Sequence, residues 1–591
     1  MKRLLLVLLA LVSLPALARE AARTAILPPN IAWNGASRAL VVPSGDRWIT
    51  PAEASGFRLT PTYDETVAYL RRLVAAAPQL KMTSIGKSAE GRDIWMIVAS
   101  SGGPAARKPR VLAQGGIHSG EIDGKDAGLM LLRDMTVRGT KRDLLELADF
   151  LFVPIFSVDG HERSSEFSRI NQRGPENAGW RTTARNLNLN RDYMKADSEE
   201  MRAMIAAIRK WDPDLYLDLH VTDGADYQYD ITFGFNGPTG FSPATSGWLE
   251  SAYAPEVTRA LDAAGHIPGP LVFGVSDDDL SKGIQLGNTD PRLSHSYGDA
   301  RHIASVILEN HSLKPYDQRV LGTYVFLEAS LRAASANVSS LRLARSSDRA
   351  RHAPLVPFDW VAKPDPQTIE FRGIEWKYTL SPVSGAVRVE YTGKPVTMRL
   401  PLVIMSEVSI SATRPAAYWV PAAWREVIEK LDLHGIRYDR TTAPREVDVD
   451  MYRLGTPVYT TPQFEGHVRV TAQTKIERRR ERFAAGSVRV PTDQALGTLA
   501  VLLLEPASPD SLFQWGFLNS ILSPTEYVEA YVMEPMAERM LAEDPALAEE
   551  FRNAIVSDEK LRTDPKERLQ WFYRRTPFYD ERALLYPIAR E

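Results

Sequence analysis

The 591-residue sequence contains no cysteine. Disulfide bonds, cysteine nucleophiles, thiolate zinc sites and a lipid-modified leader cysteine are therefore excluded. Any catalytic metal would have to be bound by His, Asp or Glu. The chain also lacks a charge excess, because 71 basic and 74 acidic side chains give a formal charge of -3. This balance argues against a dedicated nucleic-acid-binding protein, which would carry a basic surplus on one face.

Long apolar runs are scarce as well, and none beyond the N-terminus is long enough to span a membrane. One shorter run, Leu4 to Leu14, follows Lys2 and Arg3 and precedes the small residues that end at Ala18. This order of segments is typical of a secretory leader. We expect a signal peptide over residues 1–18. The mature protein is expected to be exported, in a bacterial periplasm or medium, without stable membrane insertion.

Strand-like and helix-like segments alternate through the first half of the chain, and this rhythm predicts an α/β domain. The strand-like segments are 92–100, 110–117, 150–158, 214–221 and 303–309. In such a domain, ligands bind beyond the carboxyl ends of the strands. We expect the domain to cover residues 19–350 and a proline-rich linker to follow over 351–366. A β-rich accessory domain is predicted over 367–505, and a mostly helical region over 506–591.

The segment GGIHSGEIDGK places His118 and Glu121 just after an apolar strand. A histidine and a carboxylate three residues apart can turn toward one point, and this pair suits Zn²⁺. Taken alone, such a pair is weak evidence, because it is more often a chance surface arrangement. Its position after a strand, behind two glycines that allow close approach of the backbone, favours a site.

Two further segments end strands with chemically useful side chains. His220 in DLYLDLHVTDG would add a second nitrogen ligand and leave a fourth position open, as in catalytic zinc sites. Asp218, two residues earlier on the same face, would orient His220. Glu309 in VILENHSLKPY would supply a carboxylate that accepts a proton from metal-bound water. The plain alternatives are a core histidine and strand-end acids that face solvent.

The segment NLNLNRDY offers the amide of Asn190 beside the guanidinium of Arg191. That pair suits bidentate capture of a carboxylate. As an isolated dipeptide it is more typical of an ordinary surface turn.

Taken in order, these motifs resemble the zinc metallocarboxypeptidase family of the carboxypeptidase A and B type, over about residues 60–317. The matching positions are His118, Glu121, Asp159-Gly160, Arg173, Asn190-Arg191, His220 and Glu309. The resemblance implies a three-layer α/β/α sandwich on a mixed eight-stranded sheet. It also implies one zinc ion per chain on His118, Glu121 and His220, Glu309 as general base and acid, and Asn190 with Arg191 on the substrate carboxylate.

Some family positions match less directly. The family has an arginine that stabilises the oxyanion; Arg173 ranks first for this role, and Arg181 is the alternative. Tyr297 is the best match for a tyrosine that closes over the substrate, although it lies only twelve residues before Glu309. Gly120 stands where the pancreatic-type enzymes have an arginine. Asn188 stands where the family has an aspartate, and its amide can still accept a hydrogen bond.

The predicted function is zinc-dependent hydrolysis of C-terminal peptide bonds in substrates with a free terminal carboxylate. Within the same chemistry, the alternatives are an amidopeptidase that cuts cell-wall stem peptides and a zinc deacylase. An alternative of another class is a non-catalytic protein that binds peptides or glycans through residues 367–591. A complete ligand set with Glu309 counts against that last alternative.

Overall fold

The computed structural model describes residues 26–102, 108–276, 279–523 and 525–591. The predicted signal peptide lies outside these residues. The chain divides into two compact units. The first consists of Met1–Ala416, Arg425–Tyr438 and Val490–Ser511, and the second of Ala417–Trp424, Asp439–Arg489 and Leu512–Glu591. Across the described residues, no helix combines the length and the apolar character needed to cross a membrane.

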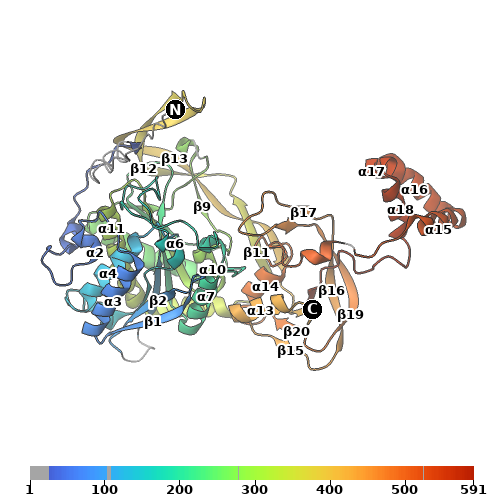
Figure 1. The fold of residues 1–591 in the computed structure, drawn as a ribbon, viewed down its shortest axis with the longest axis horizontal. Helices are drawn as coiled ribbons and strands as arrows, with labels where there is room; N and C mark the ends of the chain where they lie inside the picture. The colour runs from blue at the N-terminus through green and yellow to red at the C-terminus, as the bar shows by residue number, and fades with distance from the viewer. Residues whose placement is uncertain (1–25, 103–107, 277–278, 524) are drawn as a thin grey trace, which may run out of the picture. The chain divides into compact units, whose positions relative to one another are not determined.

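The first unit is built on a mixed eight-stranded sheet in the order β1-β2-β4-β3-β5-β10-β6-β7. Figure 1 labels β1 and β2 of this sheet. Its strands are β1 (Leu80–Lys87), β2 (Asp93–Ala99), β3 (Arg110–Gly115), β4 (Asp149–Val153), β5 (Leu215–Thr222), β6 (Ile231–Gly234), β7 (Pro268–Pro270) and β10 (Ala304–His311). The central strands β4, β3, β5 and β10 are parallel, and antiparallel pairs flank them. This confirms the predicted mixed sheet of eight strands.

Helices cover both faces of this sheet. They are α3 (Tyr63–Ala76), α4 (Asp123–Met135), α7 (Glu199–Trp211), α9 (Ala254–Ala263), α10 (Ser294–Ala300), α11 (Tyr316–Ala336) and α12 (Val338–Ala350). Gly124 brings α4 against Leu219, whereas Gly298 brings α10 close to Tyr216. Leu219 and Tyr216 lie on opposite faces of β5, because side chains alternate along a strand. The three-layer arrangement is therefore as predicted.

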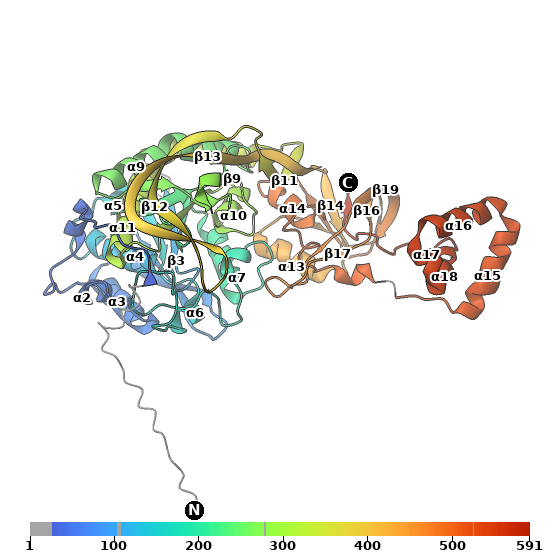
Figure 2. The ribbon, with the colours of Figure 1, turned by 90° about the horizontal axis from the view of Figure 1, so that it is seen from above.

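A second sheet in the same unit has the order β11-β13-β9-β8, and β12 also pairs with β13. Its strands are β8 (Phe273–Gly274), β9 (Ile284–Gly287), β11 (Leu355–Ala362), β12 (Gln367–Leu380) and β13 (Val387–Thr413). Figure 2 shows β12 and β13 as a long, curved pair of strands. Gly287, at φ +136°, allows β9 to reach β13, because a Cβ there would lie 2.4 Å from the carbonyl oxygen of Met405.

The predicted linker over 351–366 is therefore wrong in its local structure, since β11 occupies half of it and pairs with β13. Its prolines are compatible with a strand at the edge of a sheet, where one side needs no hydrogen-bond donors. The first compact unit continues through this segment to Ala416. The strands predicted after residue 367 thus begin within the unit that contains the eight-stranded sheet.

The second unit contains a six-stranded sheet in the order β15-β20-β14-β21-β16-β19, in which β20 extends into the first unit. Its strands are β14 (Ala417–Val420), β15 (Asp439–Arg440), β16 (Arg445–Leu454), β19 (Thr474–Phe483), β20 (Val488–Pro491) and β21 (Ala589–Arg590). The C-terminal helices are α15 (Ala530–Glu543), α16 (Pro545–Ser557), α17 (Glu559–Thr563) and α18 (Pro565–Tyr573). The predicted order of strands followed by helices is confirmed, except that the last residues return to the sheet as β21.

Candidate metal centre and cavity

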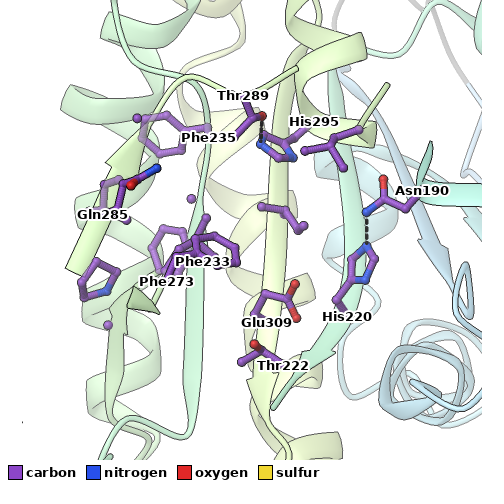
Figure 3. A pocket seen from close by; sticks show the side chains of 18 of the residues that line it. Asn190, His220, Thr222, Phe233, Phe235, Phe273, Gln285, Thr289, His295 and Glu309 are labelled. Carbon is purple, nitrogen blue, oxygen red and sulfur yellow. Dashed lines mark hydrogen bonds between the residues drawn. The ribbon is translucent and has the colours of Figure 1, made fainter. Parts of the chain in front are cut away.

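A cavity of about 920 Å³ lies at the carboxyl ends of β5 and β10 in the first unit. Figure 3 shows His220 and Glu309 on neighbouring strands, with aromatic side chains such as Phe233 on the far side of Glu309. The position agrees with the general rule that ligands bind beyond the carboxyl ends of strands in α/β sheets.

His118 and Glu121 lie in the turn between β3 and α4. Gly115 makes this turn tight, because a Cβ there would lie only 3.0 Å from the backbone nitrogen of Lys125. Both side chains are buried and line the cavity. His118 Nε2 donates to Asn188 Oδ1 at 2.9 Å, and its Nδ1 lies 3.0 Å from Glu121 Oε1.

His220 reaches the cavity through the alternation of β5. Leu217 and Leu219 pack into the core on one face, so Asp218 and His220 lie on the other. His220 Nε2 donates to Asp218 Oδ2 at 2.6 Å, and its Nδ1 lies 3.0 Å from Glu121 Oε2. Asp218 therefore orients the ring of His220, as the sequence suggested.

These residues form a group whose geometry fits a metal ion. Asn188 and Asp218 occupy the Nε2 atoms, and both Nδ1 atoms therefore face the Glu121 carboxylate. One donor atom each from His118, Glu121 and His220 lies within 4.8 Å of the others. His118 Nδ1 is buried and lies 3.0 Å from Glu121 Oε1 without forming a hydrogen bond to it, and no other described residue bonds to this atom. Two imidazole nitrogens and one carboxylate oxygen are a donor set typical of catalytic zinc.

The charges in this group depend on one another. Burial acts to raise the pKa of Glu121, but the charges of His118 and Arg169 outweigh it and hold that pKa well below the usual value. Burial lowers the pKa of His118. Burial also acts to lower the pKa of His220, but the Asp218 carboxylate raises it well above the ordinary value. Glu121 is therefore ionised and able to bind a cation.

Two arginines contact the Glu121 carboxylate. Arg169 donates to Oε1 at 2.8 Å and Arg181 to the same oxygen at 3.1 Å. Arg169 passes directly over Gly120, where a Cβ would lie 2.4 Å from its Cγ atom. Gly120, which stands where the pancreatic-type enzymes have an arginine, thus leaves room for the side chain of Arg169. Sequence reasoning missed Arg169, since no motif surrounds it.

Asn190 and Arg191 lie on a short 3-10 helix, η2 (Leu189–Arg191), and both line the cavity. Asn190 Oδ1 accepts from the backbone nitrogen of Ser294 at 2.9 Å, and its Nδ2 lies 3.4 Å from His220 Nε2. Arg191 donates to the backbone oxygen of Asn190 at 2.8 Å. The amide and the guanidinium are thus held side by side next to the histidine pair.

Glu309 lies on β10 directly opposite His220 in the parallel pairing of β10 with β5. Its side chain lines the cavity, and its Oε2 atom makes no hydrogen bond with any described residue although it is buried. Burial raises the pKa of this carboxyl to about 8. Glu309 therefore places a carboxyl oxygen that bonds to no described residue beside the group formed by His118, Glu121 and His220.

The structure does not bring two of the predicted residues to the cavity. Arg173 donates to the backbone oxygens of Leu313 and Pro28, at 2.9 and 2.6 Å. Tyr297 is fully buried, and its hydroxyl lies 2.8 Å from Nδ1 of His434. Both side chains thus make hydrogen bonds with segments far away in the sequence. The predicted residues that do meet are His118, Glu121, Arg181, Asn190, Arg191, His220 and Glu309.

The cavity also contains residues that sequence reasoning missed. His295 is buried in the wall, where its Nε2 lies 2.9 Å from Thr289 Oγ1, and burial lowers its pKa to about 4. Phe273 and Met405 line the opposite part, on β8 and β13 of the second sheet. No motif marks these positions, because the pairing of β13 with β9 brings a distant segment to the site.

The sequence is similar to those of known zinc carboxypeptidases. Residues 66–236 match the family model described as zinc carboxypeptidase. Carboxypeptidase 2 of Trichophyton rubrum is 24% identical over 479 residues, covering 78% of this chain and 84% of that protein. Carboxypeptidase Z of Gallus gallus is 31% identical over 153 residues, covering 24% of this chain and 23% of that protein. The expected bacterial membership is not borne out by these relatives.

Solved structures give a similar list. A metallo-carboxypeptidase from Burkholderia cenocepacia shares 18% identity, with a TM-score of 0.36, over 47% of this chain and 70% of that one. A metallo-carboxypeptidase from Pseudomonas aeruginosa shares 17% identity, with the same TM-score, over 48% and 70%. The matched family model and the curated relatives agree with the resemblance seen in the motifs. Residues 66–236 therefore match the zinc carboxypeptidase family, and the relative that aligns with 78% of the chain is a carboxypeptidase.

Proposed function

We propose that this protein releases C-terminal residues from peptides, with one Zn²⁺ ion held by His118, Glu121 and His220. The observation that carries the proposal is the convergence of two buried Nδ1 atoms on one carboxylate, with both Nε2 atoms already hydrogen-bonded. This arrangement sets the histidine tautomers for metal binding before the metal arrives. When bound, Zn²⁺ would supply Lewis acidity and a water molecule of lowered pKa.

Glu309 is the proposed general base and acid. Its free, buried oxygen faces the cavity beside His220, within reach of a water molecule at the open side of the ligand cluster. A raised carboxyl pKa matches a group that must take up a proton from water and later give it to the leaving amine. Since the oxygen makes no other hydrogen bond with the described residues, proton transfer would break none.

Arg181 is the proposed stabiliser of the oxyanion. Its side chain lines the cavity and is 45% exposed, so its guanidinium can turn from Glu121 toward substrate. Preorganised cationic donors of this kind stabilise charge that develops in the transition state. Arg173, which ranked first from sequence, has both of its described guanidinium contacts on backbone oxygens outside the cavity wall. Arg169 would hold the carboxylate of Glu121 in place.

Asn190 and Arg191 are the proposed binding site for the terminal carboxylate of the substrate. Both line the cavity, and the Asn190 side chain is anchored by the backbone nitrogen of Ser294. A guanidinium beside an amide can hold both carboxylate oxygens. This selects substrates with a free C-terminus. Given the predicted leader, we propose that the enzyme acts after export, outside the cytoplasm.

The test combines metal analysis with an amine-release assay on a mixed peptide library, with and without a chelator. One zinc per chain and chelator-sensitive release of C-terminal amino acids are the expected results. Zinc binding without such release would refute the peptidase proposal and direct the search to cell-wall stem peptides or acylated substrates. Absence of bound zinc would instead favour a non-catalytic binding protein.

A further inference from the structure

The hairpin of β12 and β13 lies outside residues 66–236, which match the family model. Near its tip the two strands pair in register, with Trp376 opposite Tyr391, Tyr378 opposite Val389, and Leu380 opposite Val387. Directly opposed residues point to the same side of a sheet, and so do residues two apart on one strand. One face of the hairpin therefore carries six apolar or aromatic side chains, which we call the hairpin face.

The hairpin face is largely uncovered. Tyr378 is 52% exposed, Leu380 73% and Val387 62%. The residues between them on β12, Lys377 and Thr379, place polar side chains on the opposite side. An antiparallel sheet normally turns its apolar side to a core, so a contiguous exposed apolar face marks a binding surface.

The part of the hairpin face farther from the tip borders a second cavity of about 400 Å³. Trp376, Tyr391 and Val389 form one wall of this cavity. Thr222 and Phe273 line it as well, and these two residues also line the catalytic cavity. The two cavities are therefore adjacent.

The alternation of side chains along β5 shows at which end of the site the two cavities are adjacent. Asp218, His220 and Thr222 succeed one another on one face of this strand. Asn190, which we assign to the terminal carboxylate, lies against the Nε2 side of His220, where Asp218 also binds. Figure 3 shows Thr222 below Glu309 and Asn190 above it. Thr222, which borders the second cavity, thus lies at the end of the site opposite Asn190.

We propose that the second cavity and the hairpin face bind the substrate residues upstream of the scissile bond. This inference rests on the proposed function. With the terminal carboxylate at Asn190 and the scissile bond beside Glu309, the preceding residues leave the site past Thr222 and meet Trp376 and Tyr391. Aromatic rings at this point favour apolar or aromatic side chains, which gain contact area and ring stacking there. The enzyme therefore prefers long peptides with apolar residues before the last two positions.

The test compares kcat/KM for peptides of two to six residues that share the same last two residues. Wild-type protein is expected to gain about tenfold or more once apolar residues reach the second cavity, since burying one such side chain is worth that factor. Trp376→Ala is expected to lose this gain and to keep the wild-type rate on the two-residue substrate. That rate also shows that the variant is folded.

The matched control is Lys377→Ala, on the opposite side of the same strand, which is expected to keep the full gain with length. Trp376→Phe, which retains an aromatic ring, is expected to restore much of it. Equal rates on short and long peptides in the wild type would overturn the inference and leave the proposed function intact. A gain found only with glycan-linked peptides would overturn it in favour of a sugar site. No release from any peptide would overturn the proposed function, and this inference with it.

Discussion

Replacing Glu309 with glutamine tests the proposed base and the electrostatics of its site together. Glutamine has nearly the same shape, and Glu309 Oε2 makes no hydrogen bond with the described residues that the change would break. Burial raises the pKa of Glu309 from the usual carboxyl value of 4.5 to about 8. At neutral pH the folded, metal-free protein therefore holds a proton that the unfolded chain has released.

The sign of the effect on stability follows from this shift. A carboxyl whose pKa is raised by folding stabilises the protein fully only below about pH 4.5, and this contribution is lost as the pH rises through about 8. At pH 7 the ionisable side chain costs roughly 3 kcal/mol relative to a neutral side chain of the same shape, against about 1 kcal/mol at pH 5. Glu309→Gln should therefore stabilise the metal-free protein, and more strongly at pH 7.

Urea unfolding of the metal-free wild type and variant, at pH 5 and pH 7, measures this difference. The stability advantage of Glu309→Gln is expected to grow by roughly 2 kcal/mol between the two pH values. Glu250→Gln, at an exposed carboxylate in the same cavity wall, is the matched control and should show no such growth. A pH-independent difference, or a destabilised variant, would refute the burial argument. In the zinc-loaded enzyme, Glu309→Gln should lower kcat by about 10² to 10⁴-fold if the carboxylate is the base.

Four further changes test the other residues. Arg181→Ala should lower kcat by about 10²-fold or more with little change in KM, measured on one good peptide, and a rise in KM alone would contradict an oxyanion role. Arg191→Ala should raise KM for peptides with a free C-terminus; an equal loss on amidated peptides would argue against carboxylate capture. Asp218→Asn should weaken zinc binding by about 10 to 100-fold in a competition with a chelator, because the charged partner of His220 is removed. Gly120→Ala should cost about 1–3 kcal/mol of unfolding free energy in urea, since its Cβ would lie 2.4 Å from Arg169 Cγ, whereas Gly45→Ala, where no atom lies within 4 Å of the added Cβ, is the control.

Local sequence patterns determined where the central chemistry lies. The alternation in DLYLDLHV sends leucines to the core, so Asp218 and His220 must share the other face. The absence of cysteine limits metal donors to His, Asp and Glu. His118 and Glu309 each come at or just after the end of an apolar strand-like segment. These features depend on neighbours in the chain or on the ends of strands, and they are therefore readable without the fold.

Tertiary structure alone decided which cationic and aromatic side chains join the site. Arg173 and Arg181 are separated by only seven residues, yet one reaches backbone oxygens elsewhere and the other reaches Glu121. Tyr297 turns to His434, which is 137 residues away, and no local pattern records that contact. The aromatic wall formed by Trp376 likewise exists only because β13 pairs with β9 and folds back over the first unit's own cavity. Contacts between distant segments depend on packing and register, which a single sequence does not encode in any one motif.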